Sequence, residues 1–66
     1  MMLTVNRREI EYEGEPTVAT FARLRHLPEE GVAIALNGNV LRRADWSQAE
    51  LREGDEIEVV HAIAGG

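Results

Sequence analysis

The chain has 66 residues, no cysteine and a formal net charge of −5 at pH 7. This length fits one small domain, and the lack of cysteine excludes disulfides and thiolate metal sites. The acidic charge is opposite to the basic face that binds nucleic acid, no apolar run is long enough to span a membrane, and no export signal opens the sequence. We therefore expect a cytoplasmic protein that binds neither nucleic acid nor membrane and docks on a basic partner surface.

The beginning of the chain has the pattern of a β-hairpin. Residues 2–5 alternate apolar and polar side chains and predict a first strand. Residues 6–8 are typical of a tight turn, and residues 9–13 predict a second strand. In that strand Ile10 and Tyr12 would point inward, with glutamates on the opposite face.

A short helix is predicted after the break at residues 14–16. Thr17 is a good N-cap residue, so the helix is expected to begin at Val18. Pro28 and Gly31 would end the segment. The helical spacing predicts a buried stripe made of Val18, Phe21, Ala22 and Leu24.

The second half of the chain predicts three more strands. Residues 32–36 are a continuous apolar run and indicate a central strand. The turn signal of residues 37–39 leads into a short return strand at residues 40–42. The last strand is expected over about residues 56–63.

Two features lie between the return strand and the last strand. Ser47 and Glu50 have the spacing of a capping box and predict one helical turn. Leu51 would anchor that turn in the core, and Trp46 would cover the core beneath the loop.

The order of these elements is typical of an α+β fold in which one helix packs across a mixed sheet. It is the order of the β-grasp, or ubiquitin-like, fold, in which the first and last strands are parallel neighbours at the sheet centre. We expect one β-grasp domain at residues 1–64 and a flexible diglycine tail at residues 65–66.

Alternation in the last strand predicts a candidate partner-binding patch. Ile57 and Val59 would face the core, which places Val60 on the outer face of the sheet. Small alanines gather on that face, and the predicted patch is Ala33, Ala35, Val60 and Ala62. The competing interpretation is an ordinary sheet surface. His61 is a lone histidine without a recognisable acid or nucleophile, so no catalytic role is predicted for it.

The sequence closes on Gly65-Gly66 directly after the last predicted strand. Glycine has no Cβ, so such a tail can pass through a narrow channel in another protein. We therefore interpret the Gly66 carboxylate as the reactive group. The small Ala62 and Ala64 would keep the tail slim, and Ile63 would contact the partner just before the channel, although these three residues could also simply finish the strand.

The whole chain resembles the thiamine-biosynthesis sulfur carriers. Each matching segment is weak alone, but their order and spacing together with the terminal diglycine are specific. The matching segments are Thr17-Val18-Ala19, residues 32–38 with Val40, Trp46, residues 51–60 and residues 62–66.

The resemblance implies a protein cosubstrate and not an enzyme. An adenylating enzyme of the ubiquitin-activating type would use ATP and magnesium to form an acyl-adenylate on Gly66, so the carrier itself binds no cofactor or metal. Sulfur from a cysteine desulfurase route would replace AMP, and the resulting thiocarboxylate would give its sulfur to thiazole synthase.

Other functions remain open from the sequence. The small subunit of molybdopterin synthase also ends in diglycine and carries a thiocarboxylate. A ubiquitin-like modifier would join Gly66 to a lysine of a target, and a carrier for tRNA thiolation would use the same tail. The remaining possibility is a β-grasp interaction module with an inert tail.

Overall fold

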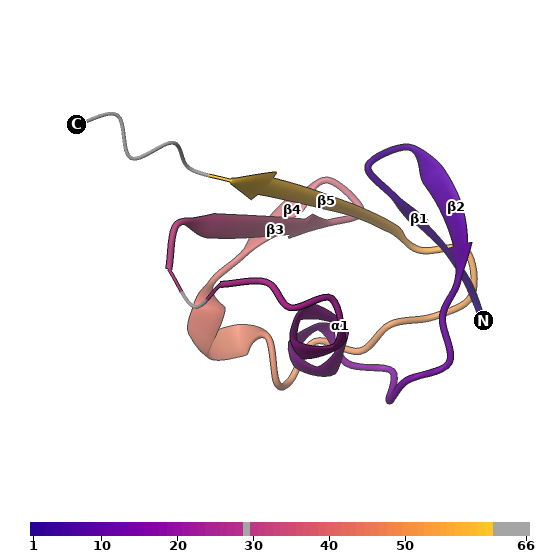
Figure 1. Cartoon of the computed structure of the whole chain (residues 1–66), viewed down its shortest axis with the longest axis horizontal. Helices are drawn as coiled ribbons and strands as arrows, with labels where there is room; N and C mark the ends of the chain where they lie inside the picture. The colour runs from indigo at the N-terminus through magenta and orange to yellow at the C-terminus, as the bar shows by residue number, and fades with distance from the viewer. Residues whose placement is uncertain (29, 62–66) are drawn as a thin grey trace.

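The computed structural model describes residues 1–28 and 30–61. In this part of the chain, five strands form one mixed sheet in the order β2-β1-β5-β3-β4, and helix α1 crosses one face of it (Figure 1). β5 pairs in parallel with β1 and antiparallel with β3 at the sheet centre. The predicted β-grasp architecture is therefore confirmed. The elements are β1 Met2–Val5, β2 Arg8–Glu11, α1 Val18–Leu24, β3 Val32–Leu36, β4 Asn39–Leu41, the 3-10 helix η1 Arg43–Asp45 and β5 Glu56–His61.

Both hairpins turn at an asparagine with left-handed backbone geometry. Asn6 and Arg7 have φ values of 49° and 69°, and Asn37 and Gly38 have φ values of 49° and 86°. Two-residue hairpin loops favour positive φ at both positions because the resulting twist matches that of the strands. Asparagine and glycine tolerate this geometry better than most residues. The predicted turns are confirmed, although β2 begins and ends earlier than expected.

Helix α1 begins at Val18, as the Thr17 cap predicts. The Thr17 hydroxyl accepts a hydrogen bond from the Thr20 backbone N–H at 3.2 Å. The first two N–H groups of the helix are hydrogen-bonded by the loop before β5. Val18 donates to the Ala49 carbonyl and Ala19 donates to the Trp46 carbonyl, each at 3.0 Å. This loop therefore completes the N-terminus of the helix, where intrahelical partners are missing.

The predicted buried stripe is right for three residues and wrong for Leu24. Val18, Phe21 and Ala22 are buried, whereas the Leu24 side chain is 52% exposed. At about 100° per residue, Leu24 points roughly 120° away from Val18, so it leaves the buried stripe. It covers Gly14 instead, where an added Cβ would lie 2.5 Å from both Leu24 Cδ1 and the Tyr12 hydroxyl.

The helical turn predicted from Ser47 to Glu50 is also wrong. The turn occurs earlier, as η1 at Arg43–Asp45. Glu50 instead forms an isolated β-bridge with Thr17, and the Leu51 N–H donates to the Pro16 carbonyl at 2.8 Å. These tertiary contacts hold the segment extended, so the local capping pattern is overridden. Trp46 and Leu51 are buried, at 4% and 3% exposure, as expected.

The core lies between α1 and the inner face of the sheet. Leu3, Ile34 and Ile57 project from the three central strands onto the helix and are almost fully buried. The Tyr12 and Phe21 rings meet edge to face with centroids 5.8 Å apart. Within residues 1–28 and 30–61, no helix is long and apolar enough to cross a membrane.

Candidate functional site

The outer face of the sheet, opposite α1, is set by the strand registers. Ala33 pairs with Val60 and Ala35 with Glu58, so these side chains share one face of β3 and β5. On the other face, Ile57 is 1% exposed and Val59 packs against the core. The predicted orientation of β5 is therefore confirmed.

Three of the predicted patch residues, Ala33, Ala35 and Val60, lie on this face. The structure adds Val40, which pairs with Ala35 across the β3–β4 hairpin. Val40 and Val60 are 75% and 56% exposed and are two of the three large apolar side chains exposed in the part of the chain described. The two-residue turn could have revealed Val40, because it fixes the register of its hairpin. We call Ala33, Ala35, Val40 and Val60 the outer apolar patch.

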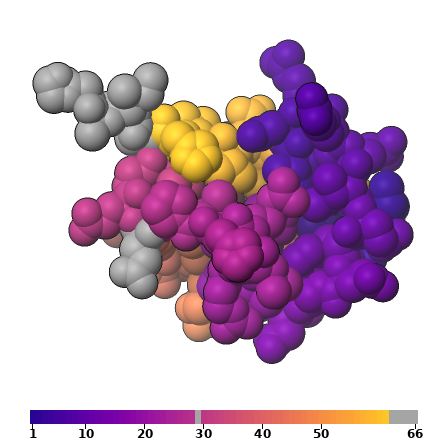
Figure 2. All heavy atoms as spheres, viewed as in Figure 1, coloured from indigo at the N-terminus to yellow at the C-terminus, as the bar shows by residue number. Residues whose placement is uncertain are grey.

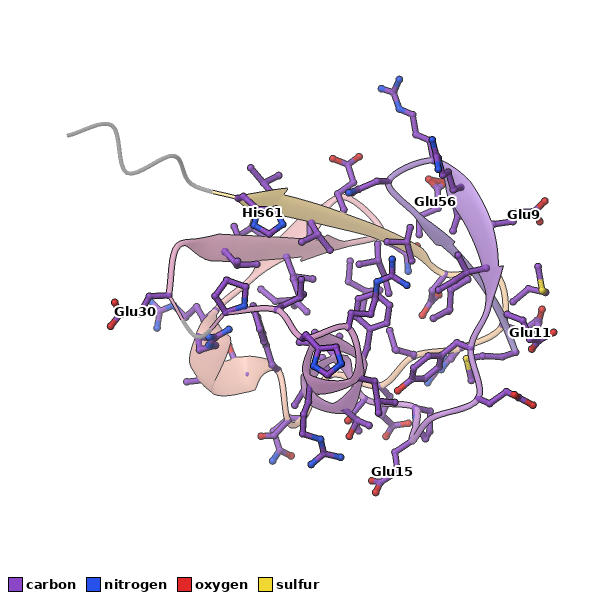
Figure 3. The ribbon with its side chains drawn as sticks, in the orientation of Figure 1. Glu9, Glu11, Glu15, Glu30, Glu56 and His61 are labelled. Carbon is purple, nitrogen blue, oxygen red and sulfur yellow. The ribbon has the colours of Figure 1, made fainter. Side chains whose placement is uncertain are left out.

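The rest of the outer face is acidic. Thr4 is flanked by Glu9 on β2 and Glu56 on β5, and Met2 pairs with Glu11. Figure 3 shows Glu9 and Glu11 projecting from β2 and Glu56 near the start of β5. Together with Glu58 these glutamates form the acidic half of the outer face.

Ion pairs neutralise little of this charge among the residues that the structure describes. Among the residues described, the one ion pair joins the Met1 amino group to Glu11 Oε2 at 2.8 Å. The hydrogen bond from the amino group to Glu11 raises the pKa of the Met1 amine above its ordinary value, against a smaller opposing effect of desolvation. The outer face thus combines a neutral, apolar part with a negatively charged part.

The end of β5 is where the predicted reactive tail begins. β3 pairs with β5 as far as His61, which lies opposite Val32. Figure 3 shows His61 at the end of the strand, and its side chain is exposed. Figure 2 shows β5 between the β1–β2 hairpin and β3 on the visible surface. Ala62, the fourth residue of the predicted patch, lies outside the described residues, as do the predicted tail residues Ile63, Ala64, Gly65 and Gly66.

A shallow hollow of about 550 Å³ lies on the helix side of the molecule, between α1 and η1. The Arg43 guanidinium stacks 4.2 Å from the Trp46 ring centroid and donates to the Pro28 carbonyl at 3.0 Å. Arg43 therefore serves to cover Trp46. Within residues 1–28 and 30–61, no three acidic or histidine side chains are placed to hold a metal ion together.

Comparisons with known proteins agree with this geometry. The model of the ThiS family matches residues 3–66. The chain is 27% identical to the Escherichia coli (strain K12) sulfur carrier protein ThiS over 66 residues, with both chains fully covered. The crystal structure of a Geobacter metallireducens thiamine biosynthesis protein (ThiS) superposes with a TM-score of 0.86 at 29% identity, again with full coverage of both chains. A solution structure of a Geobacter metallireducens thiamine biosynthesis protein gives 0.81 at 29% identity, covering 100% of this chain and 88% of that one.

Proposed function

The chain belongs to the ThiS family and is a sulfur carrier of thiamine biosynthesis, and we propose that it carries sulfur as a thiocarboxylate on Gly66. A sulfur carrier is a protein cosubstrate and not an enzyme. The observation that carries the proposal is the match of the family through Gly66, combined with the position of β5. The central strand of the sheet leads directly into the five residues 62–66 that end in the diglycine.

The chemistry begins by activating a poor electrophile. A Gly66 carboxylate oxygen attacks the α-phosphorus of ATP, pyrophosphate leaves, and an acyl-adenylate forms. A cysteine desulfurase route delivers sulfur as a persulfide, and a thiol reductant converts it to hydrosulfide while a disulfide forms. The hydrosulfide then attacks the acyl carbon. A carbon–sulfur bond forms, the bond between the acyl carbon and the adenylate oxygen breaks, and AMP departs. The resulting Gly66 thiocarboxylate then passes its sulfur to thiazole synthase.

The nucleotide is best assigned to the activating enzyme. Charge that develops during adenylation is stabilised by magnesium and cationic groups. The acidic half of the outer face carries Glu9, Glu11, Glu56 and Glu58 and would repel a triphosphate. An adenylating enzyme of the ubiquitin-activating type would therefore contribute ATP and magnesium together with the cations that hold them. We expect this encounter to take place in the cytoplasm.

The outer apolar patch is the surface we assign to docking that enzyme. Small alanines let a partner approach the sheet closely, and Val40 and Val60 offer exposed apolar contacts. Val60 also lies six residues before Gly66. A fully extended chain spans at most about 3.6 Å per residue. Docking on the patch would therefore place the adenylation site within about 22 Å of Val60.

The test is the intact mass of the carrier after incubation with ATP, magnesium, a sulfur source and an activating enzyme of the same cell. We expect a gain equal to the replacement of one oxygen by sulfur, localised to Gly66, and a further gain of one alkyl group when an alkylating agent converts the thiocarboxylate to a thioester. The matched control lacks Gly66 and should fold normally but gain no mass. An unchanged mass of the full chain, with an enzyme that activates a known carrier, would contradict the proposal.

The acceptor is tested separately. Thiocarboxylated carrier should lose its sulfur to thiazole synthase and regain its original mass. Adducts on lysines of other proteins would indicate a modifier instead. Sulfur transfer to molybdopterin synthase or to tRNA, without transfer to thiazole synthase, would contradict the assigned acceptor.

A further inference from the structure

The two edges of β5 are paired to different lengths. On one side, β3 pairs with β5 through Val32↔His61. On the other side, the register with β1 ends at Val5↔Ile57. The side chain of Asn6 continues this second edge: its Oδ1 accepts the Val59 N–H at 2.8 Å, and its Nδ2 donates to the Val59 carbonyl at 3.4 Å. Asn6 also uses its own backbone N–H to reach the Ile57 carbonyl at 2.9 Å.

We propose that Asn6 is a positioning residue for the reactive tail, because its amide clamps β5 at Val59 and fixes where the strand leaves the sheet. This inference rests on the proposed function, since it concerns the delivery of Gly66 to the activating enzyme. Val59 lies seven residues before Gly66. Val59 is one of the last three residues of β5, so holding it restrains the part of the strand that leads into the tail.

The chemistry of the clamp is specific to a carboxamide. The primary amide offers one acceptor and donors in a planar arrangement, as a backbone peptide group does. An aspartate would keep the acceptor but turn a carboxylate toward the Val59 carbonyl. Asn6 also has a φ of 49°, a left-handed geometry that asparagine tolerates. One residue thus closes the β1–β2 hairpin and extends its pairing along β5.

The second hairpin supplies an internal control. Asn37 has the same φ of 49° and also binds β5 through its side chain, with Oδ1 accepting the Glu56 N–H at 2.9 Å. This contact lies at the start of β5, whereas Val59 is near its end. Both asparagines hold β5, but only Asn6 holds the part that leads into the tail.

Loss of the Asn6 clamp should affect docking more than chemistry. Without it, the end of β5 is held by β3 alone and the strand can leave the sheet in more directions. Ordering these conformations on binding costs entropy. Once the tail is seated, the reacting groups are unchanged. The expected signature is therefore a raised KM for the carrier with kcat preserved.

The experiment compares Asn6→Gly with Asn37→Gly in the full chain. Glycine keeps the left-handed turn without strain, so each variant removes only a side-chain clamp. Pyrophosphate exchange by the activating enzyme gives KM and kcat, and amide hydrogen exchange reports opening at Val59. We expect Asn6→Gly to raise KM three- to tenfold, keep kcat within twofold and speed exchange at Val59. Asn37→Gly should leave KM and exchange at Val59 near the wild-type values.

A third variant and the wild type make the result decisive. Asn6→Asp, which retains the acceptor for the Val59 N–H, should give a KM between wild type and Asn6→Gly. Equal KM changes in the two glycine variants, or an unchanged KM in Asn6→Gly, would overturn the inference. If the wild-type carrier supports no pyrophosphate exchange by the activating enzyme, the proposed function fails. Amide hydrogen exchange at Val59 still reports whether the clamp exists.

Discussion

The inner and outer faces of the sheet alternate along the same strands but are built from different chemistry. In β5, Ile57 is buried against the helix, while its neighbours Glu56 and Glu58 are exposed on the opposite face. In β3, the Ile34 side chain is fully buried on the inner face, whereas its neighbours Ala33 and Ala35 lie on the outer face. Because side chains alternate at every residue, one strand can serve both purposes. The inner face forms the core, and the outer face carries the patch that we propose as a docking surface.

The largest expected effect is on the inner face. Phe21→Ala would leave a cavity beneath the Tyr12 ring and should cost about 3–5 kcal/mol of unfolding free energy. That is a large share of the stability of a domain of this size, which is roughly 3–10 kcal/mol. Urea unfolding followed by circular dichroism measures the loss. The control Val40→Ala on the outer face should change stability by less than about 0.5 kcal/mol, and similar losses in both variants would break the distinction between the faces.

An intermediate effect is expected on the outer face. Ala35→Glu places an unpaired charge in the outer apolar patch beside Glu58, and docking would bury it. We expect affinity for the activating enzyme to fall by more than tenfold, or about 1.4 kcal/mol, with the fold retained. Gln48→Glu adds the same charge at an exposed site away from the sheet and should change the dissociation constant less than twofold. Isothermal titration calorimetry measures the dissociation constant of each variant with the activating enzyme. An unaltered affinity of Ala35→Glu would show that the outer apolar patch is not part of the interface.

The smallest expected effect on stability comes from the ionisation of Tyr12, whose ring packs in the core on the inner face. Tyr12 is 6% exposed, and its hydroxyl donates to the Glu15 carbonyl at 2.6 Å. Burial raises the pKa of Tyr12 above its ordinary value of 10.0, and the charge of Glu15 adds to the shift. The folded chain therefore holds this proton more tightly than the unfolded chain does. Its contribution to stability is present below pH 10.0 and is lost as the pH rises through the folded pKa.

Tyr12 is the only tyrosine in the sequence, so the ultraviolet absorbance of tyrosinate reports it alone. The folded chain should titrate above pH 10.0 and the urea-unfolded chain close to that value. Coincident titration curves would show that the inner face does not desolvate the ring.

Local patterns predicted most of the fold. Alternation in residues 56–60 was enough to orient β5 because a strand has a side-chain period of two. Thr17 capped the helix as expected, since capping involves neighbours in sequence. The Ser47–Glu50 turn was wrong because Glu50 pairs with Thr17, which lies far away in sequence. The Asn6–Val59 clamp has no local signal for the same reason: its two residues are 53 positions apart.

The candidate site was predicted in part. Ala33, Ala35 and Val60 could be placed together from strand alternation alone, although their role in docking stays a prediction. Val40 joined them only through the register of β3 and β4. Leu24 shows the opposite error, because its apolar character suggested burial although its helical position pointed away from the core.

The central place of β5 also constrains how the protein is made. β1 comes first in the chain, yet its partner in the sheet is the last strand, with Thr4 paired to Glu56. During synthesis the first four strands therefore lack the strand that joins β1 to β3 and the Ile57 side chain that completes the core. A nascent or prematurely terminated chain cannot assemble the sheet or the outer face. Completion of folding is thus coupled to the synthesis of β5, so a chain that ends before this strand would lack both the completed sheet and the Val60 side chain of the outer apolar patch.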